Sequence, residues 1–151
     1  MNIVFTDGED KRFNELCKEL DSFLNNEVGS EKQEEQYNQF NSTSYIHDAV
    51  IIVDRDQPIA CGAFKKYDDE SAEIKRVFVK EGCRKLGLGT QIISLLQDKA
   101  EEKGYKRLVL ETGKPLKAAQ NMYLKFGFKI IPNYGQYKDM SESVCMEKIL
   151  K

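Results

Sequence analysis

The sequence contains no apolar run that approaches the ~20 residues needed to cross a lipid bilayer. It has no basic segment ahead of an apolar one at its N-terminus, so no signal peptide is expected. Its four cysteines are scattered without a Cys-x-x-Cys pair, which disfavours a disulfide framework or a zinc site. A formal net charge of −2 disfavours a general nucleic-acid binder. These absences predict a cytoplasmic protein with reduced thiols, no bound metal and no nucleic-acid or membrane partner.

Internal repeats, linkers and low-complexity segments are also missing. The chain has 151 residues, of which 40 % are hydrophobic and 32 % are charged. That balance is typical of a soluble globular protein with a buried core, and the length suits one domain. We therefore predict a single domain over residues 1–151.

One stretch of the chain, residues 73–96, combines a strand, a basic loop with glycines and an amphipathic helix. The run 77–79 has the β-branched and aromatic character of a buried strand. After the loop, apolar residues recur at steps of three and four, as on one face of a helix: Leu88, Ile92, Leu95, Leu96 and Ala100. Gly87 and Gly89 thus lie at a helix N-terminus, where free backbone N–H groups bind phosphate and a Cβ would hold it away.

Three anion-binding motifs compete for this loop, and their spacings separate them. Gly82 and Gly87 have the spacing of a Walker A loop, but Leu88 stands where the lysine must reach the phosphates. A dinucleotide fingerprint needs a third glycine three residues after Gly89, and Ile92 occupies that place. The remaining pattern, Arg84-x-x-Gly87-x-Gly89, resembles the coenzyme A pyrophosphate loop of the GNAT superfamily of N-acetyltransferases.

A second segment downstream supports the same resemblance. Residues 121–128, Asn-Met-Tyr-Leu-Lys-Phe-Gly-Phe, are similar to the Tyr-x-x-x-Gly-Phe helix end that follows the pyrophosphate loop in this superfamily. The order and spacing of the two motifs match, and the implied elements cover roughly residues 45–150. The Leu-Glu111-Thr-Gly113 segment and the Ser-Val-Cys145-Met-Glu-Lys ending resemble a bacterial branch of small acetyltransferases.

The resemblance implies an α+β fold with a mixed, mostly antiparallel central sheet of six to seven strands, flanked by helices and splayed at the acetyl-CoA cleft. Strand patterns lie near residues 3–5, 49–53, 59–64, 74–79, 107–111, 129–131 and 144–150. Helical patterns cover residues 10–27, a very polar stretch 30–40 that is expected to form a mobile helix or lid, residues 88–103, and residues 112–127 with a proline near the first turn.

The cosubstrate of the family is acetyl-CoA, and the resemblance implies which residues of this chain hold it. The main chain of the central strand would bind the pantetheine arm, the loop N–H groups the pyrophosphate, and Asn121 the pantetheine amide. The implied coenzyme-binding residues are Val77, Phe78, Val79, Arg84, Lys85, Leu86, Gly87, Leu88, Gly89, Thr90 and Asn121. The expected acceptor is the primary amine of a small molecule, and a homodimer is common in such proteins.

Direct transfer of an acetyl group from a thioester to an amine needs a base and an acid. The amine must lose a proton before it attacks, and Glu73 is the first candidate base, ahead of Glu111 or a chain of waters. The departing thiolate needs a proton or a hydrogen bond, which the phenol of Tyr123 can supply. Glu111, Tyr45 and His47 are the expected acceptor contacts.

Each of these roles has a plainer alternative. Tyr123 can be a core residue with its hydroxyl at an edge, Glu73 an exposed strand residue, and Asn121 a solvated helix residue. The single histidine, His47, has no partner in the sequence, which favours a structural or surface role. The alternative function is a non-catalytic acyl-CoA-binding module that regulates a partner.

Overall fold

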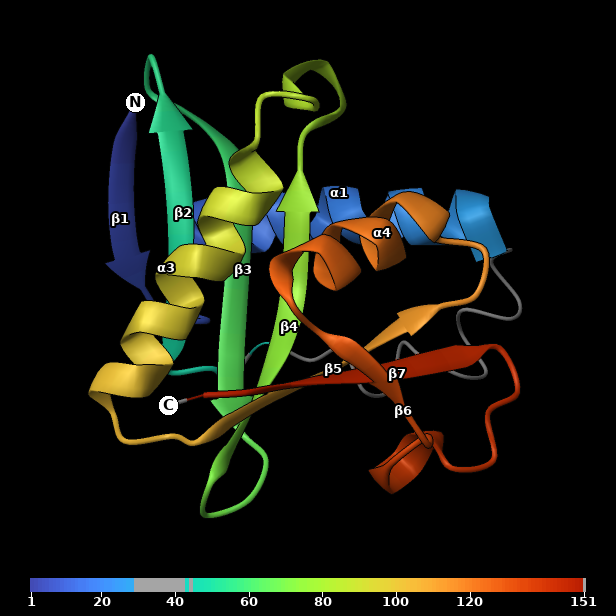
Figure 1. Cartoon of the computed structure of the whole chain (residues 1–151). Helices are drawn as coiled ribbons and strands as arrows, with labels where there is room; N and C mark the ends of the chain where they lie inside the picture. Colours follow the sequence, from blue (N-terminus) through green and yellow to red (C-terminus); the bar gives the residue numbers. More distant parts are fainter. Residues whose placement is uncertain (29–42, 44, 151) are drawn as a thin grey trace.

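The computed structural model of the protein describes residues 1–28, 43 and 45–150 (Figure 1). The polar helix expected over residues 30–40 lies outside these residues. Seven strands form one sheet in the order β1-β2-β3-β4-β5-β7-β6, in which β4 and β5 run parallel and the other neighbours antiparallel. The strands are β1 Asn2–Thr6, β2 Asp48–Asp54, β3 Gln57–Lys66, β4 Ser71–Val79, β5 Arg107–Gly113, β6 Lys129–Ile131 and β7 Ser143–Ile149. The predicted α+β fold with a mostly antiparallel sheet is therefore confirmed.

Helices cover both faces of the sheet, and each face has its own apolar core. The helices are α1 Lys11–Val28, α3 Leu88–Glu102 and α4 Lys117–Phe126, with 3₁₀ turns at η2 Glu81–Cys83 and η3 Gly135–Tyr137. In Figure 1, α3 and α4 lie in front of the sheet and α1 crosses behind it. Phe13 and Leu16 of α1 pack in one core with Ile51, whereas Ile92 and Leu96 of α3 belong to the other. Among the described residues, no helix has the length and apolar character needed to cross a bilayer.

Helix α4 begins later than the sequence pattern indicates. The strand β5 continues through Gly113, which pairs with Ser143 of β7, so the sheet ladder includes residues that were expected in the first helical turn. Pro115 precedes the helix, whose N-cap is Leu116. The pairing of β5 with β7, rather than the position of Pro115, therefore determines where α4 begins.

The close approach of α3 to β3 depends on Gly62. A Cβ at this position would overlap Ile92 Cγ2 and would lie 3.0 Å from Leu96 Cδ1. We expect Gly62→Ala to lower the free energy of unfolding by about 1–3 kcal/mol, because a packed core accommodates an extra methyl group only by shifting its neighbours. Urea unfolding measures the change. Gly82→Ala is the control, since a Cβ there would meet no heavy atom within 4 Å of the described structure. Equal stability of the two variants would contradict this account of the packing.

The sheet opens between β4 and β5. These strands pair over residues 71–73 and 107–109, and the ladder ends at that point. Farther along, β4 and β5 diverge, with β5 and β7 running steeply across β4 in Figure 1. A bulge in β4 places Arg76 and Val77 opposite the single residue Gly62, and Arg76 adopts a φ of 59°. Such a bulge bends and twists its strand, which contributes to the divergence.

Candidate active site

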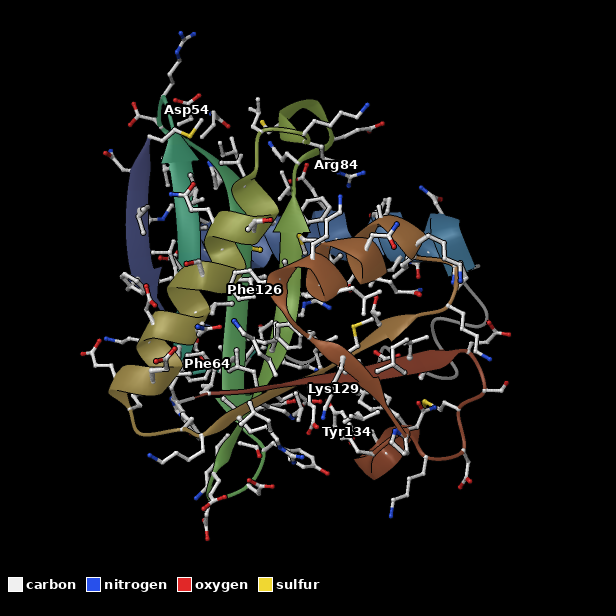
Figure 2. All side chains as sticks on the ribbon, in the orientation of Figure 1. Asp54, Phe64, Arg84, Phe126, Lys129 and Tyr134 are labelled. Atoms are coloured by element: carbon white, nitrogen blue, oxygen red, sulfur yellow. The ribbon has the colours of Figure 1, made fainter. Side chains whose placement is uncertain are left out.

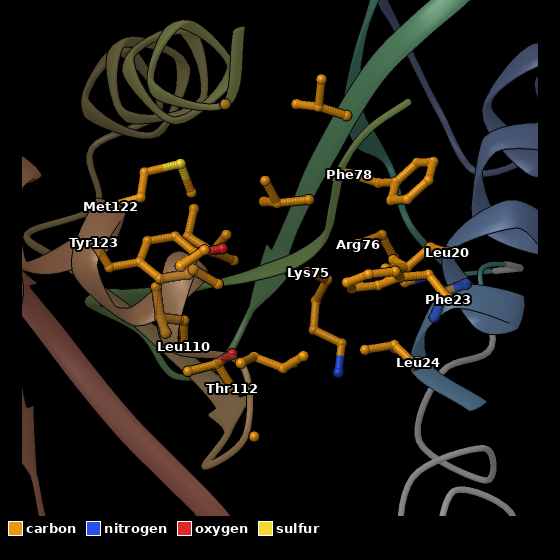
Figure 3. Close-up of a pocket in the computed structure, with 18 of the residues that line it drawn as sticks. Leu20, Phe23, Leu24, Lys75, Arg76, Phe78, Leu110, Thr112, Met122 and Tyr123 are labelled. Atoms are coloured by element: carbon orange, nitrogen blue, oxygen red, sulfur yellow. The ribbon is translucent and has the colours of Figure 1, made fainter. Parts of the chain in front are cut away.

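A cleft of about 800 Å³ lies where β4 and β5 diverge (Figure 3). Its lining residues come from β4, from the loop and first turn of α3, from the end of β5, from α4 and from α1. In Figure 3, Met122 and Tyr123 reach it from α4 on one side, and Phe23 and Leu24 from α1 on the other. The cleft therefore brings the glycine loop and the tyrosine helix, which are distant in sequence, to one site.

The loop before α3 presents backbone donors at one end of the cleft. Gly87 is the N-cap of α3 and has a φ of 76°, a left-handed conformation that glycine adopts without strain. The N–H of Gln91 donates to Gly87 O at 3.0 Å, so the N–H groups at positions 88–90 precede the first helical hydrogen bond. Leu88, Gly89 and Thr90 all line the cleft. These free donors and the positive end of the helix dipole suit a phosphate group.

Cationic side chains and a close contact between α3 and α4 lie at the same end of the cleft. Arg84 and Lys85 line the cleft. The Arg84 guanidinium lies 4.7 Å from the centre of the Phe23 ring, and its Nε donates to Val79 O at 3.1 Å. A Cβ at Gly89 would lie 2.7 Å from Met122 Sδ, so glycine lets α3 approach α4 here. The residues present thus fit a diphosphate: free amides, positive charge and room for close approach.

The edge of β4 faces the open part of the cleft. Val77 at the bulge, and Phe78 and Val79 after it, line the cleft beyond the point where the ladder with β5 ends. A strand edge of this kind offers main-chain donors and acceptors to an extended ligand. This edge leads from the loop before α3 toward Tyr123 and the carboxylates.

Tyr123 enters the cleft from α4 and is 7 % exposed. Its ring packs edge-to-face against Phe128 at a centroid distance of 5.6 Å. Burial, together with the nearby charge of Glu111, raises the pKa of its hydroxyl well above the ordinary value. The hydroxyl therefore stays protonated at neutral pH and is a hydrogen-bond donor in the cleft.

The two candidate bases have different surroundings. Glu73 is 2 % exposed, so the alternative of an exposed strand residue is wrong. Its carboxylate accepts a hydrogen bond from Tyr134 Oη at 2.6 Å and lies 3.8 Å from Lys65 Nζ. Burial raises the pKa of Glu111 to about 7, although a 2.7 Å hydrogen bond from Ser143 Oγ opposes the shift. Both carboxylates line the cleft.

Sequence reasoning placed Tyr137 in a loop beside the acceptor pocket but missed two cations of β4 near these carboxylates, Lys75 and Arg76. Lys75 and Tyr137 line the cleft, and Lys75 Nζ donates to Tyr137 Oη at 3.3 Å. Arg76 also lines it and donates to Cys17 O at 2.8 Å. Two consecutive cations inside an otherwise apolar strand could have indicated them. Burying such charges costs free energy unless each one has an anionic or hydrogen-bonding partner.

Four residues predicted for the site lie outside the lining of the cleft. Leu86, Asn121, Tyr45 and His47 are all exposed. The Tyr45 ring lies 4.8 Å from Lys65 Nζ, which is itself 3.8 Å from Glu73. Their roles stay predictions. In the described part of the chain, no group of three or more His, Cys, Asp or Glu side chains is placed to hold a metal ion.

Comparison with known proteins agrees with this geometry. A model of the acetyltransferase (GNAT) family matches residues 13–128. The uncharacterized N-acetyltransferase YsnE of Bacillus subtilis is 33 % identical over 97 residues, which are 63 % of this chain and 64 % of that protein. The matched part thus spans less than two thirds of this curated relative.

Solved structures share the fold over more of the chain. A Klebsiella pneumoniae protein assigned as an acyl-CoA N-acyltransferase has a TM-score of 0.81 and 26 % identity, and the match covers 99 % of this chain and 97 % of that one. A GNAT family acetyltransferase from Elizabethkingia anophelis, whose structure has acetyl-CoA bound, has a TM-score of 0.61 and 25 % identity. That match covers 68 % of this chain and 76 % of the other.

Proposed function

The chain belongs to the acetyltransferase (GNAT) family, and we propose that it is an enzyme that transfers the acetyl group of acetyl-CoA to a primary amine of a small molecule. We further propose that residues 1–151 act as one domain. One observation carries the proposal: the free amides after Gly87 and the buried hydroxyl of Tyr123 line the same cleft. This arrangement suits a ligand with a diphosphate at one end and a reactive sulfur at the other.

The proposed reaction is direct attack of a neutral amine on the thioester that acetyl-CoA supplies. A C–N bond forms, the C–S bond breaks, and the proton lost by the amine goes to a base of the protein. The amides after Gly87 hold the pyrophosphate, and the main chain of residues 77–79 orients the pantetheine arm. A main-chain N–H near Phe78 donates to the carbonyl oxygen as it becomes negative. Tyr123 donates to the departing sulfur.

We assign the base role to Glu111 ahead of Glu73. A general base works best when the pKa of its conjugate acid lies near the working pH, and burial brings Glu111 to about 7. Glu73 is already held by the Tyr134 hydroxyl and lies near Lys65. This arrangement suits a carboxylate that positions its neighbours. The order of the two candidates is therefore reversed relative to the sequence-based expectation.

The Glu111 assignment predicts a pH dependence. The base acts when it is deprotonated, so kcat/KM should fall as the pH drops below about 7. This decrease at low pH is the acidic limb of the pH profile. Glu111→Gln should remove this limb and lower kcat/KM by roughly 10²-fold or more. Glu73→Gln is the matched comparison and should keep the limb. Loss of the limb in Glu73→Gln and its persistence in Glu111→Gln would reverse the assignment.

Stability gives a second readout of the same shift. The folded-state pKa of Glu111, about 7, lies above the ordinary value of 4.5, so the folded protein binds an extra proton between these pH values. The protonated form of Glu111 therefore contributes to the free energy of unfolding at low pH, and this contribution is lost as the pH rises toward 7. Glu111→Gln should stabilise the protein more at pH 8 than at pH 5, as measured by urea unfolding.

The function is tested by incubating the protein with acetyl-CoA and a panel of amino acids, polyamines, arylalkylamines and a peptide with a free lysine. Thiol release and product mass report transfer, and calorimetry reports acetyl-CoA binding. Acetylation of a small amine is the expected result. Tight acetyl-CoA binding with no acetylated acceptor would favour the regulatory module instead, and absence of acetyl-CoA binding would overturn both.

A further inference from the structure

The cleft contains a buried ammonium that the proposed acetyl transfer does not use. Lys75 is 9 % exposed and lines the cleft. Figure 3 shows its Nζ directed into the space between Thr112 of β5 and Leu24 of α1. Its hydrogen-bond partner, Tyr137 Oη at 3.3 Å, is a neutral phenol. Burial lowers the pKa of the Lys75 ammonium, which means that the charged form is poorly solvated here.

The other charges near this ammonium are paired or partly neutralised. Arg76 forms an ion pair with Asp21 at 2.9 Å on the α1 side. Glu73 lies 3.8 Å from Lys65 Nζ and accepts the 2.6 Å hydrogen bond from the Tyr134 hydroxyl. Glu111, with a pKa of about 7, is partly protonated at neutral pH. Among the described residues, the buried ammonium makes no ion pair of its own within 4.0 Å.

Glu111 and Lys75 thus face one cleft with opposite charges. Both line it, and the charges of Glu73 and Glu111 act on the ammonium, but neither carboxylate forms an ion pair with it. A ligand that carries an amine and a carboxylate complements this pair, because the amine meets the candidate base and the carboxylate meets the lysine. Buried charges are favourable only when such partners are supplied.

Apolar side chains of α1 line the cleft beside Lys75. Leu20, Phe23 and Leu24 of α1 line this side of the cleft, and Figure 3 shows the three side chains grouped beside Lys75. A ligand that fills the space binds more tightly when it places an apolar group against these side chains. A polyamine, which has cationic groups and no carboxylate, fits neither the ammonium nor these apolar side chains.

We propose that the acceptor is an amino acid or a related aminocarboxylate with an apolar side chain, and that its carboxylate binds the ammonium of Lys75. This inference rests on the proposed acetyltransferase activity and adds the substrate class. In this arrangement the acceptor amine lies toward Glu111, its carboxylate contacts Lys75, and its side chain packs on α1. Lys75 is a specificity residue that touches the substrate.

Matched acceptors test the inference. L-Leucine is compared with 3-methylbutylamine, and L-phenylalanine with 2-phenylethylamine, so that each pair differs by the carboxylate. The parent enzyme should have a kcat/KM at least about tenfold higher for the amino acid of each pair. Lys75→Met should lower this ratio by roughly 10- to 100-fold, and Lys75→Arg should keep part of it. The ratio is insensitive to a partial loss of folded protein. Lys66→Met, an exposed lysine outside the cleft, should leave it unchanged.

Binding separates failure of this inference from failure of the proposed function. Calorimetry measures L-phenylalanine binding to the protein saturated with coenzyme A, in the parent and in Lys75→Met. Binding that is lost in Lys75→Met supports the carboxylate subsite even if no acceptor is acetylated. Acetylation of both members of each pair at equal rates, or an equal loss for both in Lys75→Met, overturns the inference while the enzyme assignment stands. Absence of amino-acid binding together with absence of turnover overturns it as well.

Discussion

Replacing Tyr123 with phenylalanine is expected to lower kcat by about 10²–10⁴-fold, the usual effect of removing a positioned acid. Tyr123 lines the cleft, and its hydroxyl is protonated at neutral pH, so it can donate a hydrogen bond to the leaving sulfur. The affinity for acetyl-CoA should change by less than about threefold, because we propose that the amides after Gly87 and the edge of β4 supply most of the binding. Single-turnover assays at saturating acetyl-CoA measure the chemical step.

Tyr105→Phe is the matched control, since it removes the same atom elsewhere in the protein. Tyr105 packs edge-to-face against Phe64 at 5.8 Å and lies outside the lining of the cleft. Its kcat should equal that of the parent. Full activity of Tyr123→Phe would show that water or another donor protonates the sulfur, and the role given to Tyr123 would be wrong.

Replacing Gly87 with glutamate is expected to weaken acetyl-CoA binding by at least about 100-fold. The new carboxylate would stand beside the free amides at 88–90 and repel the pyrophosphate that we propose they hold. A side chain at a φ of 76° also costs about 1–2 kcal/mol of backbone strain. Calorimetric titration with acetyl-CoA measures the loss of affinity.

Two further variants separate charge from strain. Gly82→Glu adds the same charge at an exposed position in η2, before the anion-binding loop, and should change affinity by less than about threefold. Gly87→Asn carries no charge, and asparagine tolerates the left-handed conformation, so its loss should be smaller than that of Gly87→Glu. Binding by Gly87→Glu that matches the parent would mean that the pyrophosphate does not lie at this turn.

The sequence was most informative where local pattern and local structure coincide. The run 77–79 and the steps from Leu88 to Ala100 specify a strand and a helix by their own spacing, and the turn between them needs glycine at Gly87. The strand expected at 107–111 was also found, with an end two residues later, because the pairing of β5 with β7 extends to Gly113. Boundaries of this kind depend on a partner strand that lies far away in the chain.

The inner polar residues could not be placed from sequence because their partners come from distant elements. Glu73 meets Tyr134, and Lys75 meets Tyr137, across separations of 61 and 62 residues. The bulge at Arg76 shifts the alternation of β4, so a simple period of two assigns its side chains to the wrong faces. The raised pKa of Glu111 likewise depends on burial, which no spacing rule reveals.

The three residue pairs that join β4 to β5 have a consequence beyond chemistry. A pantetheine arm on the open edge of β4 would extend the hydrogen bonding of a divided sheet, so the cosubstrate would also serve as a structural part. By mass action, loaded molecules then resist unfolding more than empty ones. Acetyl-CoA would thus stabilise the folded protein as well as serve as its substrate.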